Sequence, residues 1–457
     1  MYENIKSPSD IIAWAYNLLD QKKTEFPKGK MYAFYKNEIR RIVEQHNNKF
    51  LEFVIVIGSK FPITEIDDAN KEAFLLALLD VVSEFYSQDY DSDFLGLPQI
   101  KYNETLKPLN TLFNDKYFVY PKVNHDLNKL LNELHGGLRK TTFTNPINAF
   151  LKRFIIVTRE EMNEFQFRFI SYEDVLYLNA ITTDKKILFT FVPFIIHELD
   201  YYFDIEEDKE SGYFSIKGPL SEEKDKELLN RYMLSLEKAF KKEIVPEIVI
   251  FPEMILTERI VNCLPQMIID LNLDSSSLIL AGTLWKDNKN IAYLYNHKGD
   301  LLLKQEKFYG FSYEKEGSTF LEKIDHERSG HILNILDLKN LGKIAIFICK
   351  DAKSEIYLNL LKLLNVDLVL IPSYSTSDDV LSHMTDLAQN HHCTTVYANV
   401  CSTGKMDIGQ IIVPSKEAVK PDGKKDKREA KMHPITKQQC VNCDAFCDGI
   451  DFILNLK

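Results

Sequence analysis

The sequence predicts an α/β protein in which a mixed, helix-rich N-terminal region precedes a region of alternating strands and helices. Apolar residues recur at helical spacing in much of the first part of the chain. From about residue 207, short and strongly apolar runs alternate with amphipathic segments, which is typical of a sheet covered on both sides or paired with a second sheet. The length of 457 residues fits two or three domains. We place the boundary between residues 1–206 and residues 207–457.

The N-terminal region is expected to hold several helices and a few strands. A Ser-x-x-Asp start at Ser7 favours a helix. Helices are predicted over 7–23, 31–50 and 70–86, and strands over 50–60, 153–161, 164–175 and 186–203. The strand over 50–60 rests on the β-branched run that ends at Gly58. No motif here carries chemistry, since the His197-Glu198 pair lacks the second histidine of a zinc-binding helix.

The C-terminal region follows a more regular order. Ser221 and the acidic residues after it predict a capped amphipathic helix over 221–240. Strands are predicted over 212–220, 244–253, 277–285, 343–349, 366–373 and 394–400, a hairpin over 290–308, and helices over 257–273 and 354–365. The basic stretch near 415–432 is expected to be a solvated insertion before a final strand.

Composition narrows the classes of function. A net charge of −11 does not favour binding to nucleic acid or to an anionic membrane. The N-terminus lacks the pattern of a signal peptide, and the longest apolar run, ILFTFVPFII, is too short to span a membrane. Seven cysteines is an odd number, which argues against a disulfide framework and favours a reducing, cytoplasmic setting.

Three residues stand where chemistry is plausible. Cys349 ends an apolar strand just before a helical pattern, where a thiolate could be stabilised. Glu253 ends the strand IVIFPE, and a buried carboxylate of this kind can serve as a general base. Lys307 follows the hairpin turn at Gly299 by eight residues and could stabilise a developing negative charge. Each residue alone is more simply a core thiol or a charge at the end of an element.

The ordered set of Glu253, Lys307 and Cys349 resembles the nitrilase or carbon-nitrogen hydrolase superfamily. NVDLVLIPSYS is similar to that family's strand after the cysteine, and LAQNHHCTTVYANVCSTG resembles its "RAxENxxxVxxaN" segment, with Ala388 and Asn399 in register. GQIIVPS and DFILNL look like its last strands. The resemblance covers about residues 207–457 and implies an α-β-β-α sandwich.

The resemblance also implies a mechanism. Cys349 would be the nucleophile, Glu253 the general base, and Lys307 the group that stabilises the tetrahedral intermediate together with the backbone N–H of Lys350. Many family members position the substrate with a second glutamate between the lysine and the cysteine, for which we take Glu314, with Glu316 close behind. The resemblance implies no required cofactor.

Several positions depart from the family pattern. Lys350 replaces an uncharged residue after the nucleophile, and a cation there could lower the thiol pKa or select an acidic substrate. Gln305 stands where tyrosine is common. Leu387 and Asn390 replace the arginine and glutamate of the "RAxEN" helix. These differences indicate a divergent branch whose substrate cannot be taken over by analogy.

The remaining cysteines admit other interpretations. Cys440, Cys443 and Cys447, with His433 upstream, contain one C-x2-C pair, so a structural zinc is possible but is less favoured than plain thiols. Cys263, Cys393 and Cys401 lie in apolar patterns that predict core positions. A papain-like arrangement would need a histidine after Cys349. The candidates for that histidine are His383, His391 and His392.

Two hypotheses of function follow. The first is an amidase-type hydrolase of non-peptide C–N bonds that acts through a thioester on a small-molecule amide. The second is a nitrilase-like assembly or sensing module in a multidomain protein, for example in bacterial phage defence. A homo-oligomer is expected in either case. No membrane partner is expected.

Overall fold

The computed structural model is described in two units, each taken by itself. Unit 1 comprises residues 1–124 and 140–166, and unit 2 comprises residues 125–139 and 167–457. Within them the structure describes residues 2–19, 29–46, 49–86, 111–113, 115–121, 147, 151, 154–158, 166–172, 186–194, 197–273, 277–324, 332–338, 342–354, 361, 366–375, 383–385, 387–388, 393–401, 407–414, 430–436, 439 and 449–455.

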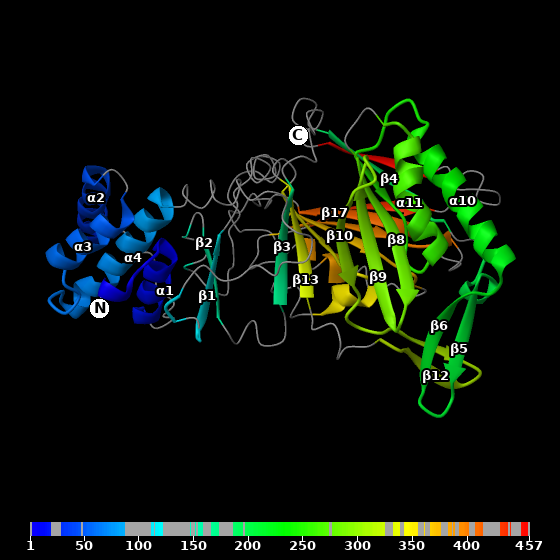
Figure 1. The fold of residues 1–457 in the computed structure, drawn as a ribbon, viewed down its shortest axis with the longest axis horizontal. Coiled ribbons are helices and arrows are strands. Elements are labelled where there is room, and N and C mark those ends of the chain that lie inside the picture. Colours follow the sequence, from blue (N-terminus) through cyan, green and yellow to red (C-terminus); the bar gives the residue numbers. More distant parts are fainter. Residues whose placement is uncertain are drawn as a thin grey trace, which may run out of the picture. The chain divides into compact units, whose positions relative to one another are not determined.

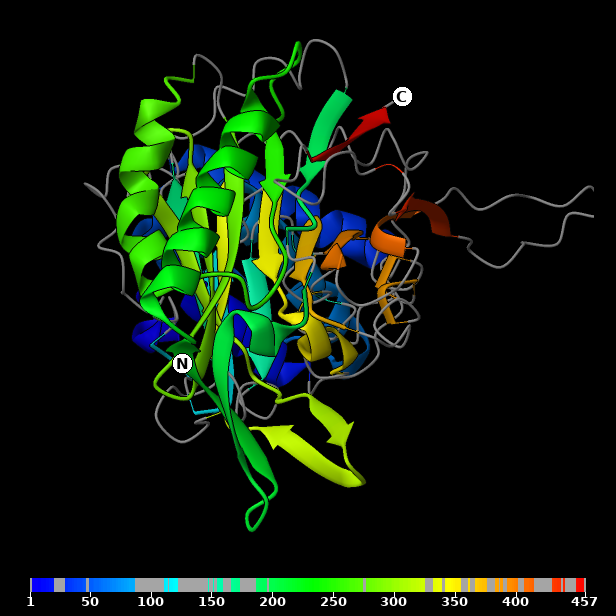
Figure 2. The same cartoon turned by 90° about the vertical axis from the view of Figure 1, so that its right-hand side faces the viewer.

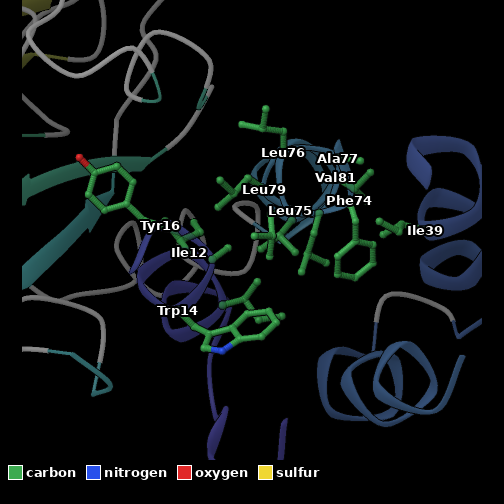
Figure 3. Packing of buried hydrophobic residues seen from close by; sticks show 14 of the residues in the cluster. Ile12, Trp14, Tyr16, Ile39, Phe74, Leu75, Leu76, Ala77, Leu79 and Val81 are labelled. Atoms are coloured by element: carbon green, nitrogen blue, oxygen red, sulfur yellow. The ribbon is translucent and has the colours of Figure 1, made fainter. Parts of the chain in front are cut away.

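Unit 1 is a helical cluster with a small sheet. It contains η1 (Tyr2–Asn4), α1 (Pro8–Leu18), α2 (Lys30–Gln45), α3 (Phe50–Lys60), α4 (Asp68–Phe85), β1 (Tyr117–Pro121) and β2 (Phe154–Thr158). Leu75 and Leu79 of α4 pack toward Ile12 and Trp14 of α1 in the centre of this unit (Figure 3). The predicted start of α1 is confirmed, because Ser7 and Asp10 form a reciprocal capping box.

The strand predicted over 50–60 is wrong, because this segment is the helix α3. Phe53, Val54 and Ile57 are buried at helical spacing, so tertiary packing repays the helix propensity that β-branched residues lack, which is only a few tenths of a kcal/mol each. Gly58 does not end a strand. It lies under the ring of Tyr2, where an added Cβ would stand 2.9 Å from Cδ2.

Unit 2 contains two large sheets. The six-stranded sheet has the order β10 (Leu301–Glu306), β9 (Lys289–Asn296), β8 (Leu278–Lys286), β7 (Ile248–Ile250), β4 (Lys186–Phe191), β19 (Ile450–Asn455). The seven-stranded sheet has the order β18 (Ala430–Thr436), β17 (Asp407–Pro414), β16 (Thr394–Ala398), β15 (Leu368–Pro372), β14 (Gly342–Ile346), β13 (Ile332–Leu338), β3 (Gln166–Tyr172).

Both large sheets include a strand that precedes the predicted boundary at residue 206. β3 forms one edge of the seven-stranded sheet, and β4 lies between β7 and β19. β4 pairs in parallel with β7 and antiparallel with β19, so segments from the middle and the end of the chain meet there. The sheets of unit 2 therefore draw on residues from before position 207.

Two helices cover one face of the six-stranded sheet, α10 (Glu222–Phe240) and α11 (Glu258–Asp270) (Figure 1). Tyr232 of α10 stacks on Phe251 with 4.5 Å between ring centroids, and its hydroxyl donates to the carbonyl of Ala281 at 3.0 Å. Ser221 caps α10, as predicted, by accepting from the N–H of Lys224. The α/β class is thus confirmed. Most of the helical segments predicted after Cys349 lie outside the described residues.

A smaller four-stranded sheet, here called the arm, extends away from the large sheets (Figures 1 and 2). Its order is β11 (Ser312–Lys315), β12 (Ser318–Glu322), β6 (Tyr213–Pro219), β5 (Phe203–Asp208). β12 joins β6 in parallel, so two hairpins that are distant in sequence form one sheet. The arm matters for the site because β12 ends at Glu322.

Candidate active site

Glu253 is delivered into the interior of unit 2 by the segment that follows β7. Its side chain is fully buried. The chain turns sharply here, and Met254 has a φ of +58°. Gly282 of β8 makes room for the turn, because an added Cβ would stand 2.6 Å from the carbonyl oxygen of Pro252. The N–H of Met254 donates to Oγ1 of Thr283 at 2.8 Å, which fixes the loop.

Lys307 follows β10 and points at the same place. Its backbone N–H donates to the carbonyl of Asn290 at 2.8 Å. Its Nζ lies 2.7 Å from Oε1 of Glu253 and 2.7 Å from Oε2 of Glu322, and all three side chains have no exposure. A buried ammonium is therefore shared by two buried carboxylates. The structure brings together two of the three residues chosen from sequence and adds a third charged group.

Glu322 is the residue that sequence reasoning missed. Glu314, chosen as the second glutamate, is exposed on β11, and Glu316 is exposed in the turn beyond it. Glu322 instead accepts from Nζ of Lys307 and from the N–H of Phe311 at 3.2 Å. The signal was present in the strand STFLE, where Phe320 and Glu322 alternate toward the buried side.

Cys349 lies directly after the buried stretch that continues β14. It begins the short helix η3 (Cys349–Lys353), has a φ of +49°, and is 4% exposed. A positive φ in a residue with a side chain is uncommon and costs free energy, and such residues cluster at functional sites. Burial raises the pKa of the thiol to about 12, and the charge of Glu253 adds to the rise, whereas Lys307 and the hydroxyl of Ser373 lower it. The group at neutral pH is therefore a thiol that needs a base.

The electrostatic balance of the site follows from these contacts. Burial lowers the pKa of Lys307, but Glu253 and Glu322 outweigh it, and the pKa lies above its usual value. Burial raises the pKa of Glu253, Lys307 lowers it and Glu322 raises it, with a net upward direction. Two carboxylates around one ammonium thus leave a negative site in which Glu253 can accept a proton from a nearby thiol.

A loop after β15 closes the site beside Glu253. The N–H of Tyr374 donates to Oε2 of Glu253 at 2.9 Å, and the N–H of Glu253 donates to the carbonyl of Ser373 at 3.4 Å. Asn399, the residue directly after β16, holds this loop. It accepts from the N–H of Ser375 at 3.0 Å and donates to its carbonyl at 2.8 Å. This gives a physical role to the asparagine that the sequence comparison singled out.

Asp351 ties the nucleophile loop to the lysine loop. Its Oδ1 accepts from the N–H groups of Phe308 and Tyr309 at 3.1 and 2.9 Å. Burial raises the pKa of this carboxyl to about 8, against the lowering effects of Lys307 and the backbone donors. A single buried side chain thus connects the segments that carry Cys349 and Lys307.

The other predicted residues have varied positions. Lys350 is half-buried, and its Nζ donates to the carbonyl of Gly310 at 3.0 Å. Gln305 is buried and accepts from the N–H of Asn334 at 2.9 Å, so it links β10 to β13. Leu387 and Ala388 are buried.

The core placement of the remaining described cysteines is confirmed for Cys393 and Cys401, but Cys263 is only partly buried on α11. Residues 390–392, 440, 443 and 447 lie outside the described part of the chain, and so does most of the basic stretch near 415–432. Among the described residues no cluster of three or more His, Cys, Asp or Glu side chains is arranged to hold a metal ion. None of the described helices is both long enough and apolar enough to cross a membrane.

This chain is similar to several solved structures of nitrilase-superfamily proteins. No protein-family model and no curated protein sequence matches it. Over 55% of its length it is similar to the crystal structure of Saccharomyces cerevisiae Nit3, a member of branch 10 of the nitrilase superfamily. The identity is 15%, 91% of that chain is covered and the TM-score is 0.33.

A mutant of the Nesterenkonia AN1 amidase from the nitrilase superfamily is similar over 55% of this chain and 91% of that chain. Its identity is 13% and the TM-score is 0.33. Another mutant of that amidase, whose structure shows the result of Michael addition of acrylamide at the active site cysteine, is 11% identical. The match covers 54% of this chain and 91% of the amidase chain, and the TM-score is 0.32.

Proposed function

We propose that unit 2 is a hydrolase of non-peptide C–N bonds, of the amidase type, that uses Cys349, Glu253 and Lys307. The observation that supports it most is the buried contact of 2.7 Å between Nζ of Lys307 and Oε1 of Glu253. The charges of both groups act on the thiol of Cys349, a residue with a positive φ. A buried charge pair beside a buried thiol is costly to maintain, and such arrangements cluster at functional sites.

The first half of the proposed reaction forms a thioester. Sγ of Cys349 attacks the carbonyl carbon of the amide, while Glu253 takes the thiol proton. The negative charge that develops on the carbonyl oxygen is stabilised by Nζ of Lys307 and by the backbone N–H of Lys350. The C–N bond then breaks, and the proton held by Glu253 passes to the leaving nitrogen, which departs as ammonia or an amine.

The second half restores the enzyme. Glu253 takes a proton from a water molecule, whose oxygen attacks the thioester carbonyl carbon. The same donors stabilise the second tetrahedral intermediate, the C–S bond breaks, and Cys349 recovers its proton. The second half yields a carboxylic acid and the free thiol, so over both halves an amide and water give a carboxylic acid and ammonia or an amine.

The test measures release of ammonia from a panel of small aliphatic, aromatic and acidic primary amides. We expect activity in the wild type that falls at least about 1,000-fold in Cys349→Ala. Cys263→Ala is the matched control, because Cys263 is a half-buried thiol on the outer helix α11, and it should retain full activity. Running each amide beside its nitrile separates an amidase from a nitrilase.

Activity that survives in Cys349→Ala for every amide would overturn the proposal. The hypothesis of an assembly or sensing module would then take its place. Light scattering examines that alternative directly, since an assembly module must be larger than a monomer in solution.

A further inference from the structure

Asn290 touches both carboxylates of the site. It lies at the start of β9 and is fully buried. Its Nδ2 donates to Oε1 of Glu253 at 2.9 Å and to Oε1 of Glu322 at 3.1 Å. Lys307 donates to the same two carboxylates. Asn290 and Lys307 therefore bridge the pair at two points, one with a neutral donor and one with a cation.

The amide group is suited to this position for an electrostatic reason. Two buried carboxylates repel each other, and a single ammonium balances only one of them. An aspartate in place of Asn290 would add a third acceptor, and an apolar residue would supply no donor. Both amide hydrogens can be used without adding charge. The orientation of the amide is determined by its neighbours, since turning it would place Oδ1 against two carboxylates.

The other end of the Asn290 amide group has a cost. Its Oδ1 is buried and has no hydrogen-bond partner among the described residues. An unsatisfied buried acceptor destabilises the folded protein. Its Nδ2, by contrast, donates to both glutamates, so the donors are the part of the side chain that contacts the site.

We propose that Asn290 is a positioning residue, which holds Glu253 and Glu322 in their contacts with Lys307 and keeps Glu253 oriented as the base for Cys349. This inference rests on the function proposed above. Asn290 acts through Glu253 and does not touch the substrate. The charged and titratable groups around Glu253 come from several elements, namely Lys307 after β10, Glu322 on β12 and Cys349 after β14, with Asp351 acting on Lys307 from η3.

The test uses acrylamide as a probe, so it does not require knowledge of the natural substrate. The thiol sulfur adds to the terminal alkene carbon, the C=C π bond breaks, and the proton that the thiol gives up to Glu253 is delivered to the neighbouring carbon. The rate of labelling at Cys349 is followed by mass spectrometry of peptides from pH 4 to 9. In the wild type the rate should fall at acid pH as Glu253 becomes protonated, and Glu253→Gln should lose this acid limb.

Asn290→Leu keeps the approximate shape and removes the donor. We expect its acid limb to move upward by about one pH unit or more, with labelling about tenfold slower below the new midpoint, because one unit of pKa corresponds to a tenfold change. In a Glu322→Gln background the same substitution should shift the limb much less, since the repulsion between the carboxylates is gone.

Asn334→Leu is the matched control. Asn334 is also buried, its Nδ2 donates to the carbonyl of Lys304 at 2.9 Å, and its Oδ1 also lacks a partner among the described residues. Among the hydrogen bonds of the described residues, none joins Asn334 to Glu253 or Glu322. Its profile should overlay that of the wild type. Asn290→Ala provides a second variant if the leucine fails to fold, as judged by circular dichroism.

The outcomes separate the two proposals. If a folded Asn290 variant has the wild-type acid limb, the role of Asn290 is refuted while the proposed function stands. If wild-type Cys349 is labelled no faster than Cys263 and shows no acid limb, the proposed function fails, and the role of Asn290 fails with it.

Discussion

Nζ of Lys307 lies 2.7 Å from Oε1 of Glu253, and neither side chain is exposed. The same nitrogen lies 2.7 Å from Oε2 of Glu322, which comes from the end of the arm. The charged side chains of the site thus come from the six-stranded sheet and the arm, whereas Cys349 follows β14 of the seven-stranded sheet.

Replacing Lys307 by methionine should destabilise the protein by about 3–5 kcal/mol, because two buried carboxylates lose their cation. The free energy of unfolding in urea measures this. Lys289→Met is the control, since Lys289 pairs with Glu306 at 3.0 Å at a partly exposed position and should cost under about 1 kcal/mol. Equal losses in the two variants would contradict the view that burial sets the cost.

At position 349, a glycine substitution should destabilise the protein no more than an alanine substitution, whereas at most buried positions glycine is the more destabilising of the two. At a φ of +49° a Cβ is strained by roughly 1–2 kcal/mol, and glycine relieves this. Cys349→Gly should therefore be at least as stable as Cys349→Ala in thermal unfolding. Cys401 is buried and has no positive φ, so its glycine variant should be the less stable one. The same order at both positions would argue against backbone strain at Cys349.

Gly282→Ala should damage the site through the backbone of Glu253. The new Cβ would stand 2.6 Å from the carbonyl oxygen of Pro252 and 2.7 Å from Cγ1 of Ile255. We expect a loss of stability of about 1–3 kcal/mol and slower acrylamide labelling of Cys349. Gly218→Ala shares the positive φ, but nothing lies within 4 Å of its Cβ, so labelling should be unchanged. Unchanged labelling in both variants would refute the coupling.

The stability of the protein should fall between about pH 4 and pH 8 because of Asp351. Its pKa in the folded protein is about 8, above the ordinary value of 3.8, so the folded state keeps a proton that the unfolded state releases. The resulting stabilisation is fully present below about pH 4 and is lost as pH rises through about 8.

The measurement compares wild type with Asp351→Asn, which does not titrate, by denaturant unfolding at pH 5 and pH 8.5. The wild type should lose stability relative to the variant as pH rises. Asp208→Asn is the control, since serine and backbone donors lower the pKa of that exposed aspartate and its effect belongs to acid pH. A difference between wild type and Asp351→Asn that is independent of pH would contradict the prediction.

Local sequence patterns predict most of the described helices and strands of the structure. The capped helix after Ser221 and the apolar strands that end near Glu253 and Cys349 are visible in sequence because their periodicity and caps are local properties. The local pattern of residues 50–60 predicts a strand because β-branched residues favour strands, and only contacts with distant residues select the helix α3.

The sequence by itself determined the α/β class of unit 2 and the order in which Glu253, Lys307 and Cys349 follow one another along the chain. Only the tertiary structure decided that Glu322, not Glu314, shares Lys307 with Glu253, and that Asn290 bridges the two carboxylates. The physical reason is that these contacts join residues that are 15 to 54 positions apart in the sequence. Their partners are set by how the arm and the six-stranded sheet meet, which no local pattern encodes.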